Sequence, residues 1–181
     1  MEEHAQLTVS FLPTKQDYAD YQLAAVEAAA SPKERLALRA VGFLMVVTGF
    51  VLCLFFGLGD PYNTLLCSLL VLAGLAVGFY HDAIQPLFVR SRAQSFFDRA
   101  QERMTAQTLL FYEDRAEIRS DRYEAALPYA LLYGAYEDKN LFLLRLGPWE
   151  SRYIPKRALS GEDCETLHRL LQESLQEKFV R

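Results

Sequence analysis

The chain has 181 residues, with 19 basic and 23 acidic side chains and a net charge of −4 at pH 7. A nucleic-acid-binding protein normally concentrates positive charge on one face, so this balance argues against nucleic acid as a partner. Hydrophobic residues make up 51% of the chain, and their distribution along it carries most of the prediction.

The thiol and imidazole groups predict neither a disulfide scaffold nor a metal site. No two cysteines form a Cys-x-x-Cys pair, and the histidines lack zinc-ligand spacing. We therefore expect reduced thiols, as in a cytoplasm, and neither a metal nor a cofactor. The residues concerned are Cys53, Cys67, Cys164, His4, His81 and His168.

An N-terminal arm, residues 1–39, precedes the most apolar part of the chain. Residues 7–12 alternate between apolar and polar side chains, which predicts a half-buried strand. Thr14 and Asp17 have the spacing of a helix-capping box, and alanine-rich residues 14–30 favour a helix.

Residues 40–84 predict a transmembrane helical hairpin with spans at 40–58 and 64–82. A spanning helix needs about 20 mostly apolar residues, and no Lys or Arg occurs from Ala40 to Val89. The alternative is a pair of core helices in a soluble bundle, but such helices usually keep a polar stripe. That stripe is missing here.

Basic residues on both flanks of the hairpin predict its orientation. Positive side chains near membrane segments stay on the cytoplasmic side. We therefore expect a multi-pass protein of the cytoplasmic membrane, in contact with the lipid bilayer and with both termini in the cytoplasm. The flanking residues are Lys33, Arg35, Arg39, Arg90 and Arg92.

Gly74 and Gly78 form a small-xxx-small pair, which allows two helices to approach closely. One interpretation is a homodimer formed through the second span. The other is packing of this span against Gly42 and Gly49 of the first span. Residues 85–105 then predict an amphipathic connecting helix, which lies either on the membrane surface or on the cytoplasmic domain.

Residues 106–181 predict a cytoplasmic domain with six short strands and a closing helix. Short apolar segments separated by turn-forming residues are typical of an antiparallel meander. Ser160 and Asp163 form a second capping box, and an apolar face runs from Leu167 through Phe179. The expected strands are 108–112, 116–119, 123–127, 131–136, 141–146 and 152–154.

The resulting fold class is α+β, with a transmembrane hairpin inserted in a cytoplasmic domain. Six strands leave an exposed sheet edge, and strand 7–12 of the arm is able to supply a seventh. Seven antiparallel strands capped by a C-terminal helix is the plan of a pleckstrin-homology-like barrel or sheet.

Four short motifs stand out along the chain: Asp17–Tyr21 (DYADY), Phe111–Asp114 (FYED), Tyr136–Phe142 (YEDKNLF) and Ile154–Leu159 (IPKRAL). Together they resemble the YcxB-like family of bacterial membrane proteins. The resemblance covers the arm, the hairpin and the C-terminal domain. It implies a two-span bacterial protein with a pleckstrin-homology-like domain and no established biochemical role, and it supplies no catalytic residues.

We expect a membrane-tethered, non-enzymatic binding or scaffolding module. Arg152, Lys156 and Arg157 form the best basic patch, able to contact anionic lipid headgroups or an acidic membrane-protein partner by charge-assisted hydrogen bonds. The alternative is that Lys156 and Arg157 are simply solvated at the end of a strand.

Two other functions have some support in the sequence. The paired carboxylates Glu113–Asp114 and Glu137–Asp138 suit acid–base chemistry, but turns also favour acidic residues, and no nucleophile or phosphate-binding motif accompanies them. An accessory subunit of an oligomeric transporter or channel is the alternative function, because two spans enclose a polar pathway only within an oligomer.

Overall fold

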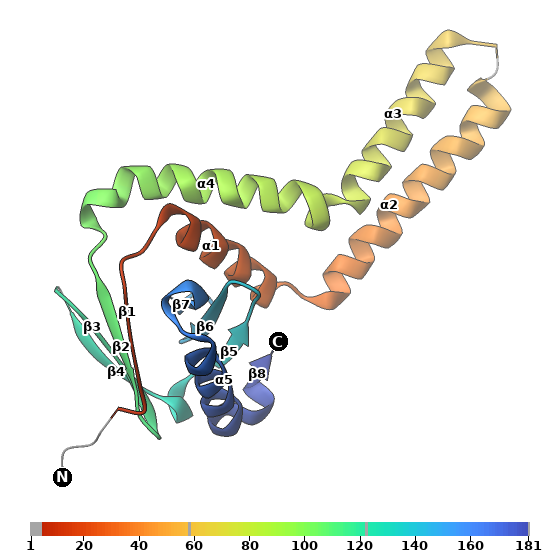
Figure 1. Ribbon diagram of the computed structural model, residues 1–181. Coiled ribbons are helices and arrows are strands. Elements are labelled where there is room, and N and C mark those ends of the chain that lie inside the picture. The colour runs from red at the N-terminus through yellow and green to blue at the C-terminus, as the bar shows by residue number, and fades with distance from the viewer. Residues whose placement is uncertain (1–4, 58, 122, 181) are drawn as a thin grey trace. The chain divides into compact units, whose positions relative to one another are not determined.

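The computed structural model describes residues 5–57, 59–121 and 123–180 and divides into two compact units (Figure 1). Unit 1 comprises residues 1–29 and 90–181, and unit 2 comprises residues 30–89. Unit 2 is therefore an insertion in the sequence of unit 1. The predicted limits at residues 1, 58 and 181 lie outside the described residues.

The first sheet of unit 1 has the antiparallel order β1-β2-β3-β4. Its strands are β1 (Leu7–Phe11), β2 (Gln107–Phe111), β3 (Arg115–Ser120) and β4 (Glu124–Pro128). β1 pairs with β2 along its whole length, with Leu7 opposite Phe111. This pairing confirms that the N-terminal arm supplies the first strand.

The second sheet has the order β7-β6-β5-β8. Its strands are β5 (Gly134–Glu137), β6 (Leu141–Arg145), β7 (Ser151–Pro155) and β8 (Phe179–Val180). Alternate residues of β6 face opposite sides of the sheet. Phe142 and Leu144 enter the main core, whereas Leu141 and Leu143 pack on Ala24 of α1 (Lys15–Ala29).

The prediction of a single barrel was wrong, because the strands form two sheets that do not close. Among the described strands, no ladder joins β4 to β5. The chain leaves the first sheet at Pro128, which has no N–H to donate to a ladder, and then makes a 3₁₀ turn at Tyr129–Leu131. This turn starts the second sheet at Gly134, later than the predicted strand start at residue 131.

Helix α5 (Gly161–Leu175) supplies leucines to the core shared with both sheets, and Ser160 and Asp163 make the predicted capping box. The predicted continuation of its apolar face to Phe179 was wrong. The chain leaves the helix at Gln176, whose φ of 48° ends the helical path, and Phe179 belongs to β8.

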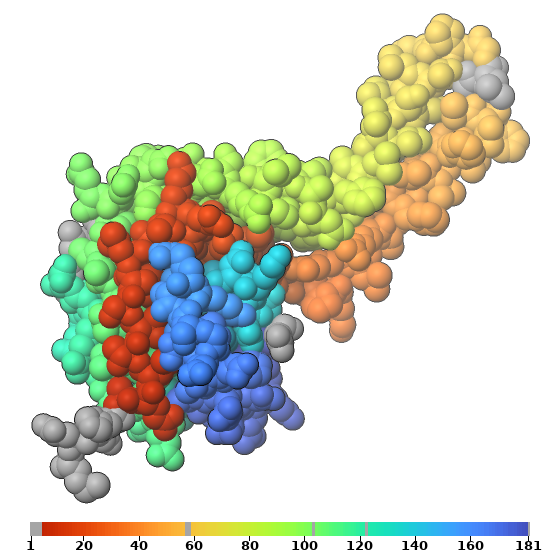
Figure 2. Space-filling model, in the orientation of Figure 1, coloured from red at the N-terminus to blue at the C-terminus, as the bar shows by residue number. Residues whose placement is uncertain are grey.

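The N-terminal arm contacts both sheets of unit 1. The capping box of Thr14 and Asp17 is present, with the Thr14 N–H 2.8 Å from the Asp17 carboxylate. Figure 2 shows β1 (red) beside the blue residues that follow β7, and the rings of Phe11 and Tyr153 lie 5.7 Å apart.

The connecting helix is α4 (Gln85–Ala100), followed by a 3₁₀ turn at Gln101–Arg103. Its residues in unit 1 dock on α1: the Phe96 ring stacks on Tyr18 at 5.5 Å, and Lys15 pairs with Asp98 at 2.7 Å. For this part of the helix, the interpretation of docking on the domain holds.

Unit 2 consists mainly of α2 (Pro32–Leu52) and α3 (Pro61–Gly78), which pack on each other. A π-helical turn at Cys53–Gly57 extends α2, and another at Tyr80–Ile84 follows α3. Within the described residues, two helices are long and apolar enough to cross a membrane, Pro32–Phe56 and Pro61–Gly78.

Glycines form the contact between these helices. A Cβ atom on Gly42 would lie 2.5 Å from the Gly78 nitrogen, and one on Gly74 would lie 2.8 Å from the Gly42 carbonyl oxygen. Gly49 packs on Val71 and Cys67. Gly74 and Gly78 thus contact the first helix of the same chain, which is the second of the two interpretations of this pair.

Candidate functional site

Strand β7 and the turn that follows it carry the predicted basic patch, and each of its cations has a carboxylate partner inside unit 1. Lys156 pairs with Glu137 at 2.7 Å, and the Arg157 Nε donates to Asp17 at 2.8 Å. Arg152 pairs with Glu150 at 3.2 Å. The three residues lie on one segment, but they serve three separate ion pairs.

Glu137 is the centre of the most buried of these pairs, because the Lys156 side chain is 24% exposed whereas that of Arg157 is 48% exposed. Its carboxylate accepts hydrogen bonds from Lys156 Nζ at 2.7 Å and from His168 Nδ1 at 2.6 Å. Burial raises the pKa of Glu137, but the hydrogen bonds from Lys156 and His168 outweigh burial and hold the pKa below its usual value. The cluster joins β5, the turn after β7, and α5.

Asp17 is the second buried carboxylate, with 7% of its surface exposed. It caps its own helix through Thr14, and its two carboxylate oxygens accept hydrogen bonds from Nε and Nη2 of Arg157. Burial raises the pKa of Asp17, but the hydrogen bonds from Arg157 and Thr14 outweigh burial and lower it. Arg157 also donates to the carbonyl of Leu12 at 2.8 Å, so one guanidinium fastens the arm to the turn after β7.

The hydrogen bonds and ion pairs of these clusters join separate elements of unit 1. Cys164 and His168 are four residues apart on α5, a spacing that suits a nucleophile and its base. Burial raises the pKa of the Cys164 thiol, whereas an activated cysteine needs a lowered pKa. Among the described residues, no group of three or more His, Cys, Asp or Glu side chains is placed to hold a metal ion.

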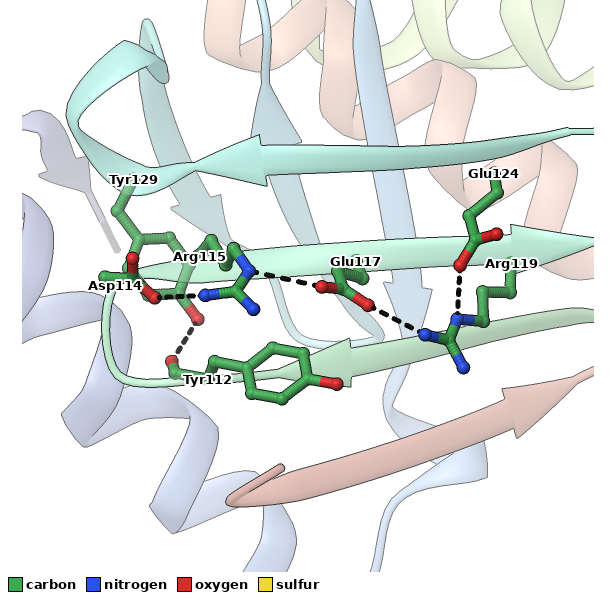
Figure 3. A network of polar contacts seen from close by, with 7 residues as sticks. All are labelled: Tyr112, Asp114, Arg115, Glu117, Arg119, Glu124 and Tyr129. Atoms are coloured by element: carbon green, nitrogen blue, oxygen red, sulfur yellow. Dashed lines mark hydrogen bonds and ion pairs between the residues drawn. The ribbon is translucent and has the colours of Figure 1, made fainter. Parts of the chain in front are cut away.

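A second polar network lies on β3 and its neighbours (Figure 3). Glu117 bridges Arg115 and Arg119, each at 3.1 Å, and Arg119 reaches Glu124 of β4 at 2.7 Å. At one end, the Tyr129 hydroxyl donates to the Tyr112 carbonyl at 2.9 Å. Arg119 and Glu124 are about half exposed or more, so their pair contributes little to stability.

The predicted membrane-flanking cations fall in two helices. Lys33 and Arg39 are exposed on α2. The Nη2 of Arg39 lies 2.9 Å from both carboxylate oxygens of Asp82. Arg35 lies on the same helix and is partly buried. Arg90 and Arg92 are exposed on α4. The Arg39–Asp82 pair brings the two ends of the helical pair in unit 2 together.

Sequence reasoning missed that the patch is internally neutralised. Asp17 and Arg157 are 140 positions apart, and Glu137 and His168 are 31 apart, so no local spacing indicated either contact. A usable signal existed in the acidic residues, because Asp17 and Glu137 both belong to the quoted motifs.

Comparison with known proteins identifies part of unit 1. Residues 111–171, about a third of the chain, match the model of a family described as YcxB-like protein. The match contains the whole Glu137 cluster and Arg157, whereas Asp17 lies outside it. No curated protein and no solved structure is significantly similar to the chain.

Proposed function

The chain contains a YcxB-like domain at residues 111–171, and we propose that it is a membrane-anchored, non-enzymatic binding or scaffolding protein that presents this domain at the cytoplasmic face of a bacterial membrane. The observation that carries the proposal is the packing of unit 2. Glycines line its interior, while Phe43, Phe50 and Phe55 are 70%, 62% and 77% exposed. Such a surface is costly in water and favourable in hydrocarbon.

The dimensions of the helices support the same conclusion. Pro32–Phe56 has 25 residues, which at about 1.5 Å per residue is about 37 Å long, and the hydrocarbon core is about 30 Å thick. Pro61–Gly78 has 18 residues, close to the lower limit for a span.

The sheet supports an even number of crossings. β1 precedes unit 2 in sequence, β2 follows it, and the two strands pair directly. Both flanks must therefore lie on one side of the proposed membrane. The basic residues Lys33, Arg90 and Arg92 favour the cytoplasmic side.

We infer a pleckstrin-homology-like plan for unit 1 from its strand order. Strands β1–β4 form one sheet, β5–β7 follow in a second, and α5 packs on the core of both. β8 is an addition to that plan. A small two-sheet domain of this kind offers sheet edges and loops for binding a protein partner.

The patch of Arg152, Lys156 and Arg157 contributes to this function only if a ligand displaces its carboxylates. Anionic vesicles test the point. We expect Lys156→Ala and Arg157→Ala to leave vesicle binding of the full chain unchanged, because both cations are already paired. A clear loss of vesicle binding would show that this patch binds anionic lipid headgroups.

Cysteine labelling tests the membrane topology. In a chain whose Cys53, Cys67 and Cys164 are replaced by Ala, Tyr62→Cys and Trp149→Cys place single thiols on residues that are 66% and 94% exposed. In intact cells, a membrane-impermeant maleimide should label Tyr62→Cys alone, and in lysed cells it should label both. Equal labelling of both thiols in intact cells would contradict the proposal.

A further inference from the structure

The last described strand, β8, is paired differently from the rest of unit 1. Phe179 and Val180 pair in parallel with Ala135 and Tyr136 of β5, whereas every other described ladder is antiparallel. β6 occupies one edge of β5, so β8 alone covers the other edge among the described strands. Its described residues cover Ala135 and Tyr136 of β5, and an uncovered strand edge invites pairing.

An aromatic side chain anchors β8. Phe179 packs against the main core, and its ring meets the His168 ring edge-on at 5.2 Å. The His168 ring is held by a hydrogen bond from its Nδ1 to the Glu137 carboxylate at 2.6 Å. Val180 is 54% exposed, so the anchoring comes from Phe179.

The backbone also approaches β5 unusually closely. A Cβ atom on Gly134 would lie 2.7 Å from the Lys178 carbonyl oxygen, and its three nearest neighbouring atoms all belong to Lys178. The segment enters through Gln176, a non-glycine residue with a φ of 48°, a conformation that is costly for such residues. The covering segment is thus held by the Phe179 ring, a two-residue ladder with β5 and a 3.4 Å hydrogen bond from Lys178 Nζ to the Leu132 carbonyl, and it begins at a strained residue.

We propose that the β5 edge and the adjoining face of α5 form a docking groove for an extended segment of a partner protein, and that residues 179–180 occupy this groove in the partner's absence. The bound segment would add a strand to β5 and place a phenylalanine against His168, followed by a β-branched residue. The inference concerns unit 1 alone and does not depend on whether unit 2 spans a membrane.

The test uses the full chain in detergent and a fluorescent peptide with the sequence of residues 176–181 (QEKFVR) as the probe. Phe179→Ala should empty the groove. We expect this variant to bind the peptide at least about tenfold more tightly than the unmodified chain, whose tethered segment competes at a high effective concentration. A peptide with alanine in place of phenylalanine (QEKAVR) should not bind either chain.

Gly134→Ala supplies the matched control. Added to Phe179→Ala, it should abolish peptide binding, because the new methyl group would lie where the backbone carbonyl oxygen at position 178 approaches. Equal peptide binding with and without Gly134→Ala would overturn the proposal, as would failure of the Phe179→Ala chain to bind the peptide.

Hydrogen exchange on the unmodified chain provides a measurement that needs no variant. Residues 177–180 should exchange much faster than β6, as expected for a segment that opens locally; equal protection would overturn the proposal. If the unmodified chain forms a dimer that Gly134→Ala dissociates, a second copy fills the groove, and the assignment to a different partner protein is wrong.

Discussion

Units 1 and 2 place their side chains in opposite ways. In unit 1, Phe111 and Phe142 are fully buried and the buried carboxylates are paired with cations. In unit 2, glycines lie inside and large apolar side chains lie outside. The first arrangement is stabilised by removing apolar surface from water. The second is stabilised by close backbone packing, as in helices surrounded by lipid.

The comparison predicts that truncating an aromatic ring destabilises unit 1 strongly and unit 2 hardly at all. Phe142→Ala should cost about 3–5 kcal/mol of unfolding free energy, because it removes a fully buried ring from the core. Phe50→Ala, at a position 62% exposed in unit 2, should leave the stability of the helical pair nearly unchanged. Chemical denaturation in detergent, followed by hydrogen exchange of each unit, measures both. A large loss for Phe50→Ala would contradict the assigned packing.

Adding a methyl group at the glycine contact should, in contrast, destabilise unit 2. Gly42→Ala places a Cβ atom 2.5 Å from the Gly78 backbone nitrogen, which cannot move aside cheaply, so we expect a loss of about 1–3 kcal/mol typical of overpacking. Gly78→Ala is the matched control, because its Cβ would lie 3.9 Å from Gly42. Thermal unfolding of the helical signal should separate the two variants, and equal midpoints would exclude this glycine contact.

The ion pairs of unit 1 should differ according to the burial of the carboxylate. Arg157→Ala leaves the buried Asp17 carboxylate without its cation, which should cost about 1–2 kcal/mol. Arg152→Ala removes an exposed pair with Glu150 and should cost less than about 1 kcal/mol. Hydrogen exchange of β1 and α1 is the readout, since Arg157 holds the arm. Equal exchange in both variants would mean that Arg157 does not fasten it.

Acid should weaken unit 1 through Glu137. Burial raises the pKa of this carboxyl group, but the hydrogen bonds from Lys156 and His168 outweigh it, so the folded-state pKa is lowered. A carboxyl group with a lowered folded-state pKa stabilises the fold at pH values above its unfolded-state pKa of about 4.3. This stabilisation is lost as the pH falls through the folded-state pKa. The pKa of Asp17 is also lowered, whereas burial raises that of Asp20, whose contribution has the opposite sign.

Glu137→Gln should therefore flatten the loss of stability between about pH 6 and about pH 3. Glu162→Gln, at an exposed position in the first turn of α5, is the control and should keep the original slope. Denaturation midpoints across this range give the answer. An unchanged slope in Glu137→Gln would assign the acid sensitivity to other carboxylates.

The same contrast explains what the sequence could predict. Strand positions followed from local alternation, and β1 to β4 lie close to their predicted ranges. The capping boxes at Thr14 and Ser160 were equally local. The division into two sheets was missed because partner choice between strands is non-local and depended on the turn after Pro128. β8 was missed because Phe179 continues the helical spacing of α5, and only the backbone at Gln176 departs from it.

The candidate site was predicted by residue type but not by arrangement. Lys156 and Arg157 form a basic dipeptide in sequence, yet their side chains reach different carboxylates on different elements. A charge pattern records how many cations are present and not which are neutralised. The glycine contact of unit 2 was predictable because the two helices are joined by a short loop and must meet.

The smallest expected effect concerns the exposed ladder on β3. Arg119 is half-exposed and pairs with Glu117 and Glu124, so Arg119→Ala should produce a slight fall in the unfolding midpoint at low salt. Because exposed pairs are screened, this fall should vanish near about 1 M salt, where the Debye length is about 3 Å. The larger fall for Arg157→Ala should persist there, because Asp17 is buried. A salt-insensitive loss in Arg119→Ala would show that the ladder contributes through packing of its aliphatic stem and not through charge.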